Sequence, residues 1–288
     1  MFVTPQDYFG RSGVRPRKRF GQHFLTQPNT AERIVRDAEL EESDVAVEIG
    51  PGLGALTRFI AGRVRRLHLV ELDRDLAHCL ETSLVSSGDC VQVHRMDALD
   101  FDFLSVGRSE EQALVVLGNL PYNISSPLTF RLLESTTVVK RAVFMVQKEV
   151  GERFAASPGT KDYGVLSVLL GMYARVTKLF SVGADQFYPP PKVESVVVRV
   201  DFFPERAGAR PSFGFMRRFV SVAFQQRRKT LHNSLRGLAG DVDLLDSAFE
   251  RAGIEPRRRP ETLAPADFFR LGGTLRSLMD FETSKVGC

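Results

Sequence analysis

The sequence predicts an α/β fold with a mostly parallel sheet, followed by a smaller all-helical domain. Between Val45 and Phe203, short runs of Val, Ile and Leu alternate with longer helix-like segments, as in successive βαβ units. Residues 204–212 are then rich in Pro, Gly and Arg, and the pattern that follows is helical. We therefore expect one domain over residues 1–203 and a second over residues 204–288.

The strand candidates are short apolar runs, found at residues 45–50, 67–73, 91–97, 113–120, 141–147, 176–182 and 195–202. The helical candidates of the second domain are amphipathic and cover residues 213–237, 242–254 and 265–281. Pro265 opens the last of them, as is common at a helix start. Ligands of open α/β sheets bind beyond the carboxyl ends of the strands, so polar residues at those ends indicate a binding site.

Composition and charge restrict the class of protein. The chain has 288 residues, 43% of them hydrophobic and 26% charged, which excludes a disordered chain. The formal net charge is only +4, but residues 8–31 carry +5, residues 206–259 carry +7 and the rest carries −8. This asymmetry favours a polyanionic partner that contacts two parts of the protein, with a solvated basic surface as the alternative.

Other classes are disfavoured by what the sequence lacks. The three cysteines show no disulfide framework and no spacing typical of a metal site, so reduced thiols and no bound metal are expected. The amino terminus does not resemble a signal peptide, and the longest apolar stretch, residues 165–174, is too short to cross a bilayer. We expect a cytoplasmic, monomeric protein without a membrane partner.

A glycine-rich loop, Glu48-Ile-Gly-Pro-Gly-Leu-Gly54, lies between a predicted strand and a helix. Its G-x-G-x-G spacing differs from the G-x-G-x-x-G of dinucleotide folds and resembles the S-adenosylmethionine loop of class I, Rossmann-like methyltransferases. That cofactor has no pyrophosphate for a helix amino terminus, and its sulfonium cation favours nearby carboxylates. Glu48 either faces the cofactor or braces the loop through a hydrogen bond.

Two further acids end neighbouring strands. Glu71 follows Gly54 by seventeen positions, where nucleotide folds place a ribose-binding acid, and Asp97 ends the third strand. A single acid at such a place is more often a cap or turn residue. In register with the glycine loop, both become candidate cofactor ligands.

The tetrapeptide Asn119-Leu120-Pro121-Tyr122 follows the fourth strand and suits methylation of an exocyclic amine on an aromatic ring. Such a nitrogen needs acceptors for its two hydrogens so that its lone pair can point at the methyl group. The Asn119 side-chain oxygen and the Leu120 carbonyl can accept them, Pro121 fixes the turn, and Tyr122 offers a ring for stacking. The alternative is an Asn-Pro turn with a core tyrosine.

Seven motifs together resemble the ribosomal RNA adenine N6-dimethyltransferase family. They lie, in order, at residues 18–25, 48–54, 119–125, 147–154, 161–168, 187–195 and 223–231. The resemblance covers roughly residues 17–275 and is greatest to the bacterial small-subunit members, which dimethylate two adjacent adenosines near the 3′ end of 16S rRNA. It implies 16S rRNA in the small ribosomal subunit as partner, and action late in subunit assembly.

The resemblance also implies roles for individual residues. The expected contacts to S-adenosylmethionine are His23, Leu25, Gly50, Glu71, Asp97 and Asn119. His23 stands where the family more often has Asn, and an imidazole can also donate a hydrogen bond. Tyr122 and Phe187 are expected to stack on the target base, and Pro189, Pro190 and Pro191 would hold Phe187 in place. The alternative for Phe187 is a place in the hydrophobic core, which the 22 Phe of a chain without Trp must mostly fill.

A basic cluster, Arg227, Arg228 and Lys229, is expected to hold rRNA phosphates together with the amino-terminal arm.

Three other functions compete with the small-subunit enzyme. One is a 23S rRNA adenine methyltransferase of the macrolide-resistance type, and one is a DNA adenine methyltransferase, which usually carries a separate target-recognition domain. The third is a mainly non-catalytic assembly factor.

Overall fold

The computed structural model describes residues 4–12, 15–17, 20–84, 90–203, 211–226 and 229–286. The chain forms two compact units, the first made of Met1–Gly151 and Val176–Pro204 and the second of Glu152–Arg175 and Glu205–Cys288. The division differs from the expected one because residues 152–175 leave the first unit and return to it. This excursion contains a helix that is apolar almost all round, and such a helix requires cover from other helices.

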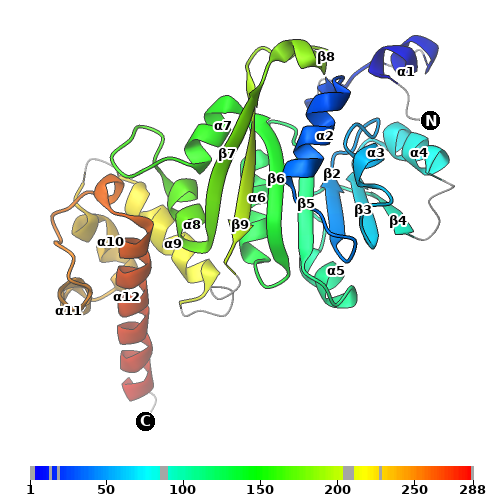
Figure 1. Ribbon diagram of the computed structural model, residues 1–288. Coiled ribbons are helices and arrows are strands. Elements are labelled where there is room, and N and C mark those ends of the chain that lie inside the picture. Colours follow the sequence, from blue (N-terminus) through cyan, green and yellow to red (C-terminus); the bar gives the residue numbers. More distant parts are fainter. Residues whose placement is uncertain are drawn as a thin grey trace. The chain divides into compact units, whose positions relative to one another are not determined.

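The first unit is built on a seven-stranded sheet with the strand order β4-β3-β2-β5-β6-β9-β7 (Figure 1). Its strands are β2 (Val45–Ile49), β3 (Arg66–Glu71), β4 (Val91–Arg95), β5 (Leu114–Asn119), β6 (Val139–Gln147), β7 (Ala174–Val182) and β9 (Ser195–Phe202). Strands β4, β3, β2, β5 and β6 pair in parallel, and β9 pairs with β6 antiparallel. The predicted α/β class with a mostly parallel sheet is confirmed.

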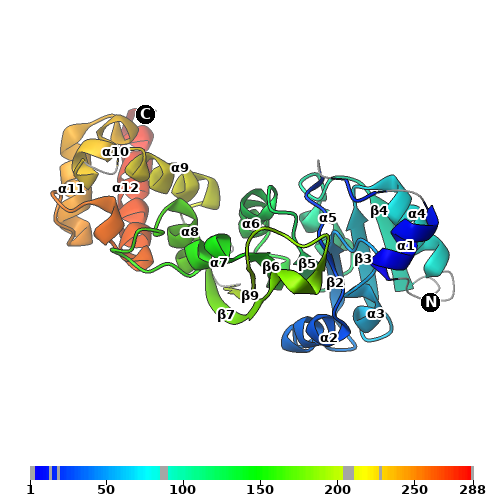
Figure 2. The ribbon, with the colours of Figure 1, turned by 90° about the horizontal axis from the view of Figure 1, so that it is seen from above.

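Helices cover both faces of this sheet. The helices of the first unit are α1 (Pro5–Ser12), α2 (Pro28–Asp37), α3 (Thr57–Ile60), α4 (Arg74–Ser83), α5 (Phe103–Ser109), α6 (Ser125–Glu134) and α7 (Lys148–Phe154), of which α7 continues into the second unit. Figure 2 shows α2 and α3 on one face and α5 and α6 on the other. Helix α2 begins at Pro28 and buries Ala31, Ile34 and Val35, an apolar stripe with helical spacing.

A second, two-stranded sheet joins segments that are far apart in the sequence. Strand β1 (Phe24–Leu25) pairs antiparallel with β8 (Phe187–Tyr188), which follows the short 3-10 helix Ala184–Gln186. Thr26 extends the pairing, since its backbone N–H donates to the carbonyl of Gln186 at 2.9 Å. The amino-terminal segment is thereby fixed against the chain that precedes β9.

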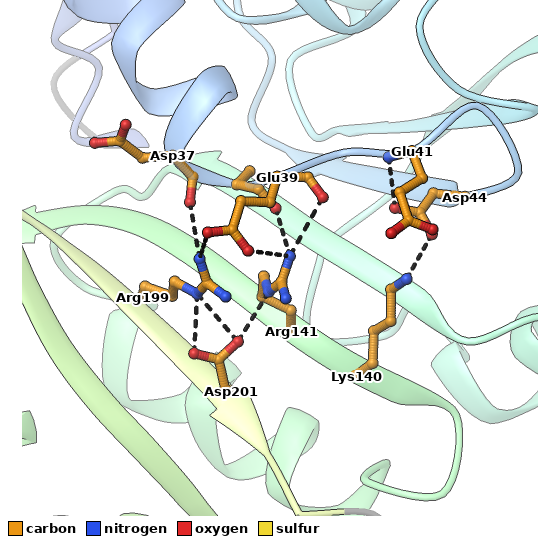
Figure 3. Close-up of polar contacts among 9 residues, drawn as sticks. Asp37, Glu39, Glu41, Asp44, Lys140, Arg141, Arg199 and Asp201 are labelled. Atoms are coloured by element: carbon orange, nitrogen blue, oxygen red, sulfur yellow. Dashed lines mark hydrogen bonds and ion pairs between the residues drawn. The ribbon is translucent and has the colours of Figure 1, made fainter.

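A network of charges stabilises the amino ends of the parallel strands (Figure 3). Asp201 on β9 lies 2.8 Å from Nε of Arg141 and 2.9 Å from Nε of Arg199. Arg199 also contacts Glu39, at 2.7 Å, and Arg141 donates to the carbonyl of Ala38 at 2.8 Å. These bonds tie the end of α2 to β6 and β9 at the edge of the sheet away from the glycine loop.

The second unit is helical. It contains α8 (Val165–Tyr173), α9 (Phe213–Phe224), α10 (Leu231–Ala239), α11 (Val242–Ala252), the 3-10 helix Pro260–Thr262 and α12 (Pro265–Val286). The expected continuous helix over residues 213–237 is wrong, because α9 ends at Phe224 and Thr230 begins a new helix as an N-cap whose side chain accepts from the Asn233 N–H. The buried Tyr163 hydroxyl donates to the Leu263 carbonyl at 2.7 Å and ties the excursion to the later helices.

Candidate active site

A cavity of about 390 Å³ lies at the carboxyl ends of β2, β3, β4 and β5. All six residues expected to bind the cofactor line it, namely His23, Leu25, Gly50, Glu71, Asp97 and Asn119. Leu120 and Tyr122 of the tetrapeptide line it as well. The structure thus brings together residues that are separated by up to about a hundred positions in the sequence.

The glycine loop forms one wall of the cavity in a conformation that needs its glycines. Gly50, Gly52 and Gly54 have φ values of 62°, 58° and 79°, in the left-handed region that other residues rarely adopt. A Cβ on Gly50 would lie 3.9 Å from the carbonyl oxygen of Asn119, and one on Gly52 would lie 3.1 Å from the ring of Phe24. The loop therefore leaves room for a ligand against bare backbone.

Two buried carboxyl groups hold this loop in place. Glu71 accepts from the Gly52 N–H at 3.0 Å and from the Asp73 N–H at 2.9 Å, and burial raises the pKa of Glu71 to about 7. Glu48 accepts from the Thr57 hydroxyl at 2.7 Å, and burial, with Glu71 nearby, raises the pKa of Glu48 to about 8. Of the two interpretations of Glu48, this contact supports the loop brace, while Glu71 is fixed at the cavity wall.

Asp97 lies half-buried at the next strand end. One of its carboxylate oxygens, Oδ1, accepts from the Leu99 N–H at 2.9 Å, which fixes the side chain as a turn acid does. A carboxylate has acceptor capacity for more than one hydrogen bond, so Asp97 can brace this turn and accept from a ligand together.

The Asn119 side chain has a defined orientation. Its Nδ2 donates to the backbone carbonyl of His23 at 2.8 Å. Because a carbonyl only accepts, this contact must be made by the amide nitrogen, and Oδ1 is the atom left to accept from a ligand. The Leu120 N–H donates to the carbonyl of Met145 at 3.0 Å, so the turn that follows is also held from β6.

The His23 ring is held by a segment far along the chain. Its Nδ1 lies 2.7 Å from the carbonyl oxygen of Pro189, so Nδ1 carries the hydrogen of this bond. In the neutral ring, Nε2 is then an acceptor, and the donor role expected from the imidazole is taken up by Pro189. The ring stacks on Tyr122 with centroids 5.5 Å apart and an interplanar angle of 27°.

Tyr122 and Phe187 differ in their surroundings. Tyr122 is half-buried at the cavity, and burial raises the pKa of its hydroxyl while the nearby Ser195 side chain opposes that shift. Phe187 does not line the cavity; it is 5% exposed and belongs to the main hydrophobic core. Phe187 pairs with Leu25 across β1 and β8, and both side chains are buried, so its stacking on the target base stays a prediction.

The basic residues singled out in the sequence fall into three groups. Arg17 is paired with acids, since its guanidinium lies 2.5 Å from Asp73 and 2.5 Å from Asp75. Lys229 is exposed between α9 and α10. Arg227 and Arg228 lie outside the described residues.

Sequence reasoning missed part of the cavity wall. Thr4, Pro5 and Phe20 line the cavity. Phe9 and Phe24 of the amino-terminal segment are buried in a small hydrophobic cluster. Tyr8 and Phe9 lie three and four positions after Pro5, a spacing that places all three on one face of a helix. This pattern is a weak signal for a packed helix, and it lies next to a segment that is marked by positive charge.

Two features are absent from the residues that the structure describes. No group of three or more His, Cys, Asp or Glu side chains in this part of the chain is arranged to hold a metal ion. Among the helices described, none combines the length and apolarity needed to cross a membrane.

The sheet order, the G-x-G-x-G loop at the end of β2 and the Asn-Leu-Pro-Tyr turn at the end of β5 define a class I, S-adenosylmethionine-dependent methyltransferase. The family model described as ribosomal RNA adenine dimethylase matches residues 13–275, and the chain belongs to this family.

Curated relatives and solved structures agree with the family. The chain is 46% identical to a ribosomal RNA small subunit methyltransferase A of Nitrosococcus oceani, over 90% of this chain and 96% of that protein. It is 45% identical to the protein of the same name from Pseudomonas aeruginosa, over 92% and 96%.

Two crystal structures are similar in fold and show lower identity. A dimethyladenosine transferase from Plasmodium falciparum has a TM-score of 0.75 at 26% identity, covering 86% of this chain and 96% of that one. The 23S rRNA methyltransferase ErmE has a TM-score of 0.66 at 25% identity, covering 88% and 99%.

Proposed function

We propose that this protein transfers methyl groups from S-adenosylmethionine to the N6 atoms of two adjacent adenosines near the 3′ end of 16S rRNA in the small ribosomal subunit. The observation that carries the chemistry is the fixed amide of Asn119, whose Nδ2 donates to His23 and whose Oδ1 is left as an acceptor at the cavity. The identity of 45–46% to proteins named for the small subunit, against 25% to ErmE, supports the choice of substrate.

The residues of the cavity fit the cofactor. Its sulfonium carries the methyl group to be transferred and is attracted by carboxylates. Glu71 and Asp97 supply two carboxylates at neighbouring strand ends, and Gly50 presents backbone without a side chain, at a φ of 62° that other residues rarely adopt. His23 and Leu25 close the opposite side from the amino-terminal segment.

Asn119 and Leu120 act on the substrate amine. The nitrogen of an adenine amine shares its lone pair with the ring and is a poor nucleophile while planar. Acceptance of its two hydrogens by Asn119 Oδ1 and the Leu120 carbonyl favours the pyramidal geometry, in which the lone pair leaves the ring plane. The methylated nitrogen is acidic and loses a proton to water, so the site needs no general base.

Tyr122 offers a face for the flipped base. Removal of an adenine from its stack costs a few kcal/mol, and stacking on an aromatic ring returns roughly 1–3 kcal/mol per base. Phe187 was expected to share this role. Its buried position supports a different one, in which the Phe187 ring holds β8 against β1 and thereby places His23 at the cavity.

The experiment that tests the proposed function uses labelled cofactor with separated small and large subunits from unmethylated cells, followed by mapping of the label. Label on adjacent adenosines near the 3′ end of 16S rRNA is expected. Label on 23S rRNA would indicate the macrolide-resistance type of enzyme, and wild-type protein that binds subunits without labelling either would indicate a non-catalytic assembly factor.

Asn119→Ala tests the catalytic assignment in the same assay. It removes an acceptor used as the amine pyramidalises, so the single-turnover rate should fall by about two orders of magnitude or more while RNA affinity changes little. Asn29→Ala is the matched control, because Asn29 is an exposed asparagine on α2 outside the cavity. A near-normal rate for Asn119→Ala would overturn the assignment.

RNA docking by the second unit is part of the proposal. Lys229 is exposed, and in the sequence it follows Arg227 and Arg228, so that three consecutive residues are positively charged. Phosphate contacts release counterions, so replacement of all three by Ala should flatten the salt dependence of RNA binding by roughly two to three in the log–log slope. Unchanged affinity for S-adenosylmethionine is the control, and an unchanged slope would place RNA elsewhere.

The setting of the reaction follows from its substrate. The curated relatives are bacterial proteins named for the small ribosomal subunit, which supports action in the cytoplasm, and the family resemblance supports a late step in the assembly of that subunit. We also expect a monomer. Sedimentation at micromolar protein concentration measures this state.

A further inference from the structure

The segment of residues 20–25, here called the strap, crosses one side of the cavity and contributes every one of its residues to the wall. It also makes the contact that orients the catalytic amide, through the His23 carbonyl and Asn119 Nδ2. This contact comes from the backbone, so the position of the strap decides whether Asn119 presents its oxygen to the substrate.

Three side chains, those of Arg17, Gln22 and Asp73, hold the strap in that position. Arg17 Nη1 lies 2.5 Å from Oδ1 of Asp73, and Gln22 Nε2 donates to the other oxygen of Asp73 at 2.9 Å. Gln22 Oε1 in turn accepts from the Arg17 N–H at 2.7 Å. We call Arg17, Gln22 and Asp73 the clasp.

The clasp satisfies a buried charge. The Asp73 side chain is only 5% exposed, and a carboxylate at such a place is stable when each oxygen has a donor. Arg17 also contacts Asp75, at 2.5 Å, so both of its terminal nitrogens face acids. The charge pattern of the sequence favours contact between the amino-terminal arm and RNA phosphates, whereas the guanidinium of Arg17 is paired with two acids of this chain.

The clasp also reaches the other side of the cavity. The backbone N–H of Asp73 donates to Glu71 Oε1, and Glu71 Oε2 accepts from the glycine loop at Gly52. One residue, Asp73, therefore connects the cofactor acid on β3 with the strap that orients Asn119.

We propose that the clasp of Arg17, Gln22 and Asp73 positions the strap so that the His23 carbonyl orients Asn119, whose Oδ1 then accepts a hydrogen from the adenine amine while that amine attacks the methyl group of the cofactor. The three are positioning residues, since they touch neither reacting atom. This inference rests on the proposed function. It assigns to Arg17 a part in methyl transfer and not in phosphate binding.

The test compares Arg17→Met and Gln22→Met with Arg95→Met. Arg95 is a matched control because it is also an ion-paired arginine, bonded to Glu81, and lies outside the cavity wall. The first measurement is the NMR signal of the Asn119 side-chain amide in ligand-free protein, identified by its absence in Asn119→Ala. The signal should move toward that of a solvated amide in both clasp variants and stay in place in Arg95→Met.

The second measurement is the single-turnover methylation rate at saturating cofactor, where displacement of Asn119 should lower the rate by about ten- to a hundredfold. Arg17→Lys keeps the charge and should recover part of the loss. The salt dependence of RNA binding should be the same as in the wild type.

Two results would overturn the proposal. One is an unmoved Asn119 signal with an unchanged rate in both clasp variants. The other is an unchanged rate for Arg17→Met with a log–log salt slope reduced by about 0.7 to 0.9, which would make Arg17 a phosphate contact. Failure of the wild-type protein to methylate small subunits would instead contradict the proposed function, and the NMR arm would still decide whether the clasp orients Asn119.

Discussion

Replacement of Glu48 by Gln should remove a pH dependence of stability that burial imposes on this protein. Glu48 is 1% exposed, its carboxyl accepts from Thr57, and burial raises its pKa from 4.5 to about 8. Between these two values the folded state keeps a proton that the unfolded chain has lost. Stability from this group is therefore present below pH 4.5 and is lost as the pH rises toward 8.

The size of the effect follows from the two pKa values. One pKa unit corresponds to about 1.4 kcal/mol, so the wild type should lose about 2–3 kcal/mol of unfolding free energy through Glu48 between about pH 5 and pH 7. Gln has nearly the same shape, accepts the same hydrogen bond and does not titrate. The difference in stability between Glu48→Gln and the wild type should grow in favour of the variant by that amount.

The assay is urea unfolding of ligand-free protein at several values from about pH 5 to pH 8, which covers most of the window between the two pKa values. Titration of groups that do not interact with Glu48 is common to both proteins and cancels in the difference. Glu42→Gln, at an exposed position outside the cavity, controls for the loss of one negative charge. A difference for Glu48→Gln that stays constant within about 0.5 kcal/mol over this range would refute the reasoning.

Three further predictions concern the same unit. Burial raises the pKa of Glu71 to about 7, and a cofactor that donates to the carboxylate binds its ionised form, so calorimetry should find affinity rising about tenfold from pH 6 to pH 8, but not in Glu71→Gln. Burial, with the charge of His94, lowers the pKa of His68 to about 4. Because the unfolded chain takes up the proton first, the free energy of unfolding should fall by about 2 kcal/mol between pH 7 and pH 5. Urea unfolding of His68→Gln should lack this dependence on pH. Gly52→Ala should cost at least about 1–2 kcal/mol and weaken cofactor binding, because φ is 58° and the new Cβ would lie 3.1 Å from Phe24. Gly10→Ala, in open space on α1, should cost nothing, and equal costs for the two would contradict the conformational argument.

The sequence by itself determined the sheet and the chemistry at its carboxyl ends. Each strand in the seven-stranded sheet overlaps an apolar run that is recognisable from local composition. The reason is that a buried strand consists of consecutive residues, most of which must be apolar. The glycine spacing and the Asn-Leu-Pro-Tyr turn are local in the same sense. Glu71 and Asp97 could be predicted at the cavity because parallel strands bring their carboxyl ends to one edge.

Tertiary structure alone decided the pairings between distant segments. Strands β1 and β8 have two residues each, too few for a periodic pattern, and their pairing turns Phe187 into a core residue. The membership of residues 152–175 in the second unit depends on which helices cover α8.

Charge partners were likewise decided by the fold. The sequence alone does not show whether an arginine contacts a phosphate or a carboxylate. Coulomb attraction acts on whichever anion the fold brings near. Arg17 is separated from Asp73 by 56 positions, and only the path of the strap places them 2.5 Å apart. The orientation of Asn119 has the same origin, since the acceptor of its amide is a backbone carbonyl, which no side-chain pattern can reveal.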